Sequence, residues 1–154
     1  MHFAANAMPN GRNSTGHVVF LNSPAFAALN LPFSEIVRVG DMLYLSGQIG
    51  NLPGTLKLAP GGIEAETRQA LQNIKTSLEA HGCSLAHIVK CTVMLADMAD
   101  WSAYNAVHTT FFDHPYPARS AFGASGLALG GRLELDVIAC AIPNSVHHLE
   151  GYKR

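Results

Sequence analysis

The sequence has few charged residues: 14% of its 154 positions are charged, against 48% that are hydrophobic. Ten basic and eleven acidic side chains leave a formal net charge of -1. Nucleic acids and anionic membranes are bound largely through an excess of basic charge, so this balance argues against both as partners. A small monomer with so little surface charge is poorly solubilised. The composition therefore predicts contact between subunits.

Cysteine and long hydrophobic runs are scarce as well. Cys83, Cys91 and Cys140 lie far apart without a CxxC pair, which argues against a disulfide framework and a zinc site. No run approaches the roughly 18 apolar residues of a membrane-spanning helix. The first six residues lack the basic start of a signal peptide. The pattern is typical of a cytoplasmic protein.

The length is that of one domain, which the hydrophobic pattern places at residues 17–143. Residues 1–16 are polar and have no hydrophobic period, so they predict a flexible leader. Residues 144–154 predict a flexible polar tail. His147 and His148 in this tail have no third ligand at a suitable spacing, so we expect no metal site there.

Short β-branched and aromatic runs predict three strands in the first third of the chain, at 18–21, 36–39 and 42–46. Gly40 and Asp41 join the last two and predict a tight hairpin. The following segment, 50–62, is rich in glycine and proline and predicts a loop.

Two helices are predicted from apolar residues at helical spacing. The first spans 63–81, with acidic residues at its positive end and Gly82 at its stop. A β-branched strand at 88–95 leads to the second helix, which has a capping acid within 97–100. This helix carries a stripe of core residues: Trp101, Tyr104, Val107 and Phe111. Strands at 120–124 and 132–142 close the chain.

This order of elements predicts an α+β fold with both helices packed on one face of a mixed β-sheet. In the last strand, most positions on both faces are apolar. With both helices on one face, we expect the other face to meet a second subunit. Glu134 and Asp136 would lie near that contact, where burial raises the pKa of a carboxyl group and an arginine lowers it.

Arg119 and Glu134 are the candidate functional pair. Arg119 starts one closing strand within YPARS, and Glu134 lies in the next within LELDVIA. A guanidinium that binds a substrate carboxylate, with an acid that activates water, forms a minimal hydrolytic site. Ordinary interpretations stay open: Arg119 could cap a loop or pair with Asp136, and Glu134 could be a solvated edge residue.

Other polar residues give weaker signals. Ser46 has no His and Asp in a nucleophile pattern, which argues against a serine hydrolase. The histidines at 81, 87 and 108 lie at helix ends or on helix faces, where capping and packing explain them better than metal ligation.

The longer motifs together resemble the Rid family, also called the YjgF family. The matching stretches run in family order from about residue 18 to 142 and include LPFSE, VGDMLYLSGQI, ETRQAL, VKCTV, PARS and LELDVIA. The resemblance implies a chorismate-mutase-like α+β fold assembled as a homotrimer with clefts between subunits. Active family members hydrolyse enamines and imines of the 2-aminoacrylate/2-iminopropanoate type to 2-keto acids and ammonia. The resemblance implies no cofactor and no metal.

The same resemblance assigns roles to residues of this chain. Arg119 would hold the substrate carboxylate, and Glu134 would position and deprotonate the attacking water. Ser46, Gly47 and Asn105 would line the cleft.

Two further cleft positions depart from the family pattern. Phe33 stands where the family often has a tyrosine, and Ala121 where archetypal members have a cysteine. The loss of a phenol and a thiol removes two polar contacts to the substrate. These departures therefore predict a substrate that is larger or more apolar than 2-iminopropanoate.

The residues leave several functions open. The leading one is the deaminase of small 2-imino acids, followed by a deaminase of a larger conjugated enamine of the 2-aminomuconate type. A third is a trimeric module that binds small keto or imino acids without turnover. A fourth is the endoribonuclease role attached to some family members, against which the near-neutral charge argues.

Overall fold

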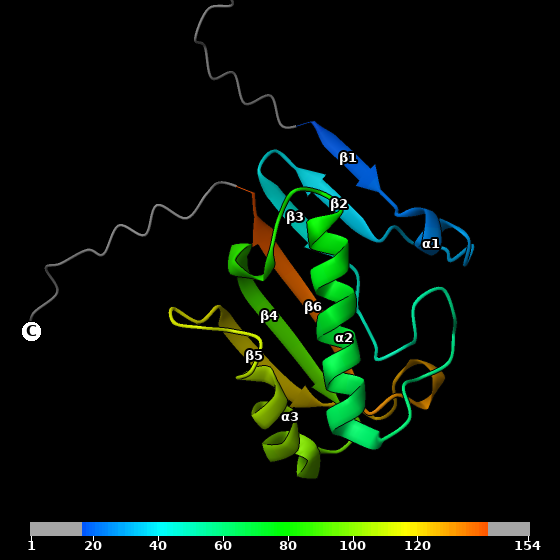
Figure 1. Cartoon of the computed structure of the whole chain (residues 1–154), viewed down its shortest axis with the longest axis vertical. Coiled ribbons are helices and arrows are strands. Elements are labelled where there is room, and N and C mark those ends of the chain that lie inside the picture. The colour runs from blue at the N-terminus through cyan, green and yellow to red at the C-terminus, as the bar shows by residue number, and fades with distance from the viewer. Residues whose placement is uncertain (1–16, 142–154) are drawn as a thin grey trace, which may run out of the picture.

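The computed structural model describes residues 17–141, which form a mixed sheet with helices packed against it (Figure 1). The predicted leader at 1–16, the predicted tail at 144–154 with its two histidines, and the end of the predicted last strand at 142 lie outside the described residues. Within 17–141, no helix is long and apolar enough to cross a membrane.

The sheet has six strands in the order β1-β2-β3-β6-β4-β5. Its strands are β1 Val18–Leu21, β2 Ile36–Val39, β3 Met42–Leu45, β4 Ile88–Leu95, β5 Ala118–Gly123 and β6 Leu133–Cys140. Only β4 and β5 pair in parallel. The predicted α+β class and mixed sheet are confirmed. Each strand agrees with a predicted run to within two residues at each end.

Three α-helices are described: α1 Pro24–Ala27, α2 Gly62–Glu79 and α3 Trp101–His108. Figure 1 shows α2 and α3 on the same side of the sheet, as predicted. The hydrophobic pattern did not predict α1, because four residues are too few for a hydrophobic period. Its cap is Ser23, whose Oγ accepts a hydrogen bond from the Phe26 backbone N–H. The second predicted helix is shorter than expected, since α3 ends at His108 and the chain continues in turns to Phe111.

The core lies between the sheet and the two longer helices. Alternate residues of β6 face it and are buried, and Tyr104 of α3 is 0% exposed. On the opposite face of the sheet, large apolar side chains are exposed to solvent: Phe20 is 69%, Tyr44 44% and Phe122 49% exposed. This face is the one that we expect another subunit to cover.

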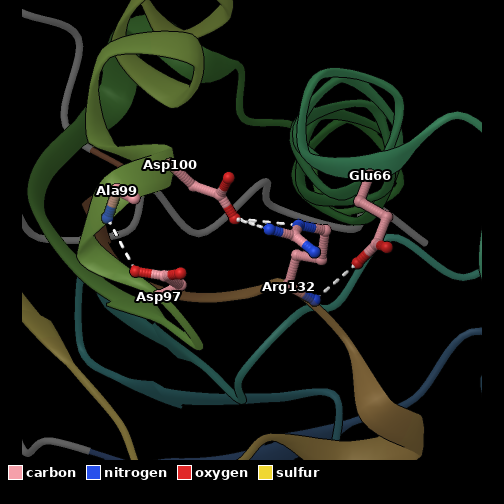
Figure 2. A network of polar contacts seen from close by, with 5 residues as sticks. All are labelled: Glu66, Asp97, Ala99, Asp100 and Arg132. Carbon is pink, nitrogen blue, oxygen red and sulfur yellow. Dashed lines mark hydrogen bonds and ion pairs between the residues drawn. The ribbon is translucent and has the colours of Figure 1, made fainter.

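A polar contact joins α2 to the start of β6. Glu66 of α2 is buried, and its carboxylate accepts a hydrogen bond of 2.8 Å from the Arg132 backbone N–H (Figure 2). The Arg132 side chain reaches the other way and pairs with Asp100 at 2.6 Å. Asp97 caps the short turn before α3 by accepting from the Ala99 N–H. Glu66 therefore fixes the chain two residues before Glu134.

Gly50 lies against the backbone of the same helix. A Cβ atom at this position would stand 2.5 Å from the Glu66 Cα and 2.6 Å from the Glu66 carbonyl oxygen. Because these are backbone atoms, Gly50→Ala is expected to lower the free energy of unfolding by about 3 kcal/mol. Thermal and urea unfolding would measure the change.

Gly126→Ala is the matched control for this prediction. A Cβ at Gly126 would meet no heavy atom within 4 Å. Its expected effect is within about 0.5 kcal/mol of zero. Equal stability of the two variants would contradict the proposed close packing of Gly50 on α2.

Candidate active site

Arg119 lies on the edge strand β5, on the side of the sheet that α3 covers. Its Cα pairs with that of Cys91, a buried residue of the helix-covered face. The Arg119 Nη1 donates to the Asn105 Oδ1 at 2.9 Å. The guanidinium carbon lies 5.0 Å from the Trp101 ring centroid and 5.6 Å from that of Tyr104. The arginine is therefore exposed but oriented by an amide and two aromatic faces.

A hollow of about 490 Å³ surrounds this guanidinium, and its wall is formed by Asn105, His108, Thr109, Tyr116, Pro117 and Arg119. Burial raises the pKa of the neighbouring Cys91 thiol to about 12, although the Arg119 charge opposes the shift. Cys91 therefore stays protonated at neutral pH and supplies no nucleophile. The hollow has the chemistry of an anion site.

Glu134 lies on the opposite face of the sheet. It pairs with Met94 of β4, and its neighbour Leu135 exchanges two backbone hydrogen bonds with Gln48. This bridge holds Gly47 against the acid so closely that an added Cβ would stand 1.9 Å from the Glu134 Oε1. Burial, followed by the negative charge of Asp136, raises the pKa of Glu134 above its ordinary value. The raised pKa makes the Glu134 carboxylate a stronger base than an ordinary glutamate.

The hollow at Glu134 is mostly apolar. It has a volume of about 350 Å³, and its apolar wall includes Phe26, Leu29, Leu31, Phe33, Ile49, Leu56 and Leu129. Phe33 packs edge-on against Phe26, with ring centroids 5.8 Å apart. Glu134 is the only ionisable side chain in this wall, within the described residues.

A buried carboxylate holds the segment that carries the two phenylalanines. Glu35 accepts hydrogen bonds from the Ser23 backbone N–H at 2.7 Å and from the Ser77 hydroxyl. Its own N–H donates to the Asn22 Oδ1 at 2.7 Å. These bonds tie the α1 segment to β2 and α2, so one wall of the Glu134 hollow is fixed by the helix layer.

The two candidate residues are not brought together within one chain. Arg119 and Glu134 face opposite sides of the sheet, and their hollows share no lining residue. The alternative pairing of Arg119 with Asp136 is not seen among residues 17–141, where Arg119 donates hydrogen bonds to Asn105 and to the Tyr104 hydroxyl.

The remaining predicted site residues are divided between the two faces of the sheet. Phe33 and Gly47 line the Glu134 hollow, and Asn105 lies beside Arg119. The Ser46 hydroxyl donates to the Ser34 carbonyl at 2.6 Å, so its proton is already engaged. Ala121 is half-buried against the core, two residues along β5 from Arg119.

The predicted capping and packing roles are seen for His87 and His108, but His108 has a further contact that was not predicted. His87 caps a short turn through the Ser84 N–H, and His108 is buried in the helix layer. His108 and Tyr116 also line the Arg119 hollow, which the sequence did not predict. The signal available was spacing, since His108 follows Asn105 by three residues on one helix face. No group of His, Cys, Asp or Glu within 17–141 is placed to hold a metal ion.

The fold and these hollows define an α+β domain with a potential acid–base site on an open sheet. Residues 23–141 match the model of the family described as Endoribonuclease L-PSP. The chain therefore belongs to this family, which is the Rid family that the motifs resemble.

Relatives and solved structures agree with this assignment. The 2-iminobutanoate/2-iminopropanoate deaminase of Capra hircus is 44% identical over 112 residues, which cover 73% of this chain and 82% of the goat protein. The human protein of the same name is 38% identical over the same length. RidA of an Antarctic Psychrobacter superposes with a TM-score of 0.69 at 38% identity, covering 71% of this chain and 89% of that one. E. coli TdcF with bound serine gives 0.67 at 34% identity, covering 71% and 88%.

Proposed function

We propose that the protein is an enzyme that hydrolyses 2-imino acids, and the enamines in equilibrium with them, to 2-keto acids and ammonia. Two observations together carry the proposal. Glu134 has a raised pKa and lies in an apolar hollow, and Arg119 is solvent-exposed and held in place by Asn105 and Trp101. Relatives that carry the name 2-iminobutanoate/2-iminopropanoate deaminase support it.

The site requires more than one chain. We propose a homotrimer of chorismate-mutase-like subunits, in which the Arg119 hollow of one subunit meets the Glu134 hollow of its neighbour. The separation of the two hollows within a chain and the exposed apolar face of the sheet support this assembly. We also propose a cytoplasmic location, because three cysteines that lie far apart in the sequence suit a reducing compartment.

In the proposed reaction, Arg119 holds the substrate carboxylate by two parallel hydrogen bonds. Glu134 takes a proton from a water molecule as the water oxygen bonds to the carbon of the protonated imine. The same carboxyl group then returns the proton to the nitrogen of the tetrahedral intermediate. It next accepts the proton of the new hydroxyl group as the C–N bond breaks and the C=O bond forms, so that a keto acid and ammonia result. Ammonia takes up this proton and leaves as ammonium. Hydrolysis involves no net oxidation or reduction, so the step needs no redox cofactor.

The apolar wall around Glu134 bears on substrate size. A hollow of about 350 Å³ lined by phenylalanine and leucine favours imino acids with an apolar side chain. A second carboxylate, as in a 2-aminomuconate, would be desolvated there without a partner. We therefore place the larger dicarboxylate second, and an RNA substrate lower still because the net charge of -1 offers phosphates no basic excess.

The test is to generate 2-aminoacrylate and 2-aminocrotonate in situ with a serine or threonine dehydratase and to follow ammonia and keto-acid release. Wild type is expected to accelerate release, and Arg119→Ala and Glu134→Ala are each expected to abolish the acceleration. Product binding without acceleration would instead identify a ligand-binding module.

The acid side of the pH profile is expected to depend on Asp136. Glu134 must be ionised to act as a base, so activity is present above its pKa and lost as the pH falls through it. Asp136→Asn removes one cause of the raised pKa of Glu134 and should move the acid limb of kcat/KM to lower pH. Asp41→Asn, in the β2–β3 turn, is the control and should leave the profile in place. An unmoved limb in Asp136→Asn would count against Glu134 as the base.

A further inference from the structure

His108 lies in the wall of the Arg119 hollow with an unusual set of neighbours. The side chain is 5% exposed, and its ring stacks on Phe112 with centroids 4.6 Å apart. It follows Asn105 by three residues on α3, so both side chains lie on the helix face that borders Arg119. The imidazole is thus held rigidly at the edge of the hollow.

The contact with Tyr104 determines which imidazole nitrogen carries the proton. The Tyr104 hydroxyl lies 2.8 Å from the His108 Nδ1, and the tyrosine is fully buried. A buried phenol must give its proton to an acceptor. Its other hydrogen-bonding partner, Arg119, can only donate, so the imidazole nitrogen is the acceptor. The phenol therefore donates to Nδ1, which places the ring proton of a neutral imidazole on Nε2.

The ring is neutral at physiological pH. Burial, followed by the nearby Arg119 charge, lowers the pKa of His108 to about 4. The same burial raises the pKa of Tyr104, so the phenol keeps its proton. Within residues 17–141, the Nε2 atom has no hydrogen-bonding partner, although the ring lines the hollow. A neutral N–H donor thus stands unpaired beside a guanidinium.

We propose that His108 is a substrate-binding residue that donates its Nε2–H to the carboxylate held by Arg119. This inference rests on the proposed function, since it concerns the same site. Tyr104 acts as a positioning residue, because it fixes the tautomer and the plane of the ring. A neutral donor adds a directed bond without a second positive charge, which the Arg119 guanidinium would repel.

Two substitutions of His108 separate binding from packing. The Asn side chain in His108→Asn keeps an acceptor near the position of Nδ1 for the Tyr104 phenol but has no donor at the position of Nε2. The Gln side chain in His108→Gln keeps a donor near the Nε2 position but leaves the buried phenol short of its acceptor.

We expect opposite results from these variants. His108→Asn should raise KM, and the Kd of the product 2-oxobutanoate measured by calorimetry, about tenfold with little change in Tm and kcat. His108→Gln should lower Tm while keeping Kd within about threefold of wild type. A purely structural His108 would instead make affinity follow Tm in both variants.

The binding arm also separates this inference from the proposed function. Wild type that binds 2-oxobutanoate without hydrolysing imines, while His108→Asn binds it more weakly, would overturn the enzyme and support His108. Normal binding by His108→Asn would overturn the inference alone, provided that Arg119→Ala loses binding. Failure of wild type to bind 2-oxobutanoate would overturn the carboxylate site as a whole.

Discussion

Mixed assemblies of Arg119→Ala and Glu134→Gln chains are expected to recover about one quarter of wild-type activity, although each variant alone is inactive. The reason is geometric. Arg119 and Glu134 face opposite sides of one sheet, so in the proposed trimer a working site takes the arginine from one subunit and the acid from its neighbour. In a random equal mixture, half of the chains have an intact Arg119 and the other half an intact Glu134. About one site in four therefore has both residues.

The measurement is imine hydrolysis by the two variants, co-expressed in equal amounts and purified through one affinity tag that both carry. A matched control mixes wild type with the double variant Arg119→Ala/Glu134→Gln. Sites shared between subunits predict about one quarter of full activity in both mixtures, when corrected for subunit composition. Sites contained within one chain predict none in the first mixture and about one half in the second. That second pattern would refute the shared site.

Gly47→Ala is expected to reduce kcat/KM about 100-fold with little loss of stability. The new Cβ would stand 1.9 Å from the Glu134 Oε1 and 2.8 Å from its Cδ, so the carboxyl group must move. This carboxyl group is the far end of a flexible side chain, so its movement should change the free energy of unfolding only slightly. A displacement of about 1 Å at a reacting group is sufficient for a loss of this size.

The kinetics of Gly47→Ala would be compared with those of Glu134→Gln and the double variant. If Gly47 acts only by leaving space for the acid, the double variant should be no slower than Glu134→Gln alone. Normal kcat/KM in Gly47→Ala would show that the acid does not need its observed position.

The sequence predicted the strands and the two longer helices because each is a run of β-branched residues or a helical stripe long enough to show its period. The short helix at Pro24–Ala27 had no such period, and only its Ser-Pro start could have indicated it. The end of α3 was misplaced because Phe111 continues the apolar stripe after the helix has become a turn.

The candidate site was predictable in its residues but not in its arrangement. Motifs identified Arg119 and Glu134, yet their faces depend on pairing with β4, which lies between β5 and β6. Strand order is a non-local property that neighbouring residues do not encode. The position of His108 beside Arg119 was not predictable for a similar reason. Its helical position predicts packing, and only the approach of β5 places Arg119 beside it.

The hydrogen bond between Glu66 and the Arg132 N–H makes the position of Glu134 sensitive to temperature. Glu66 lies near the start of α2, where Gly61 supplies no side-chain cap, and helix ends open before helix centres. Fraying of those first turns would release the start of β6 and let Glu134 drift while the sheet is still intact. Activity would then decline reversibly on warming before circular dichroism reports any melting, so that one helix end sets the working temperature of the whole protein.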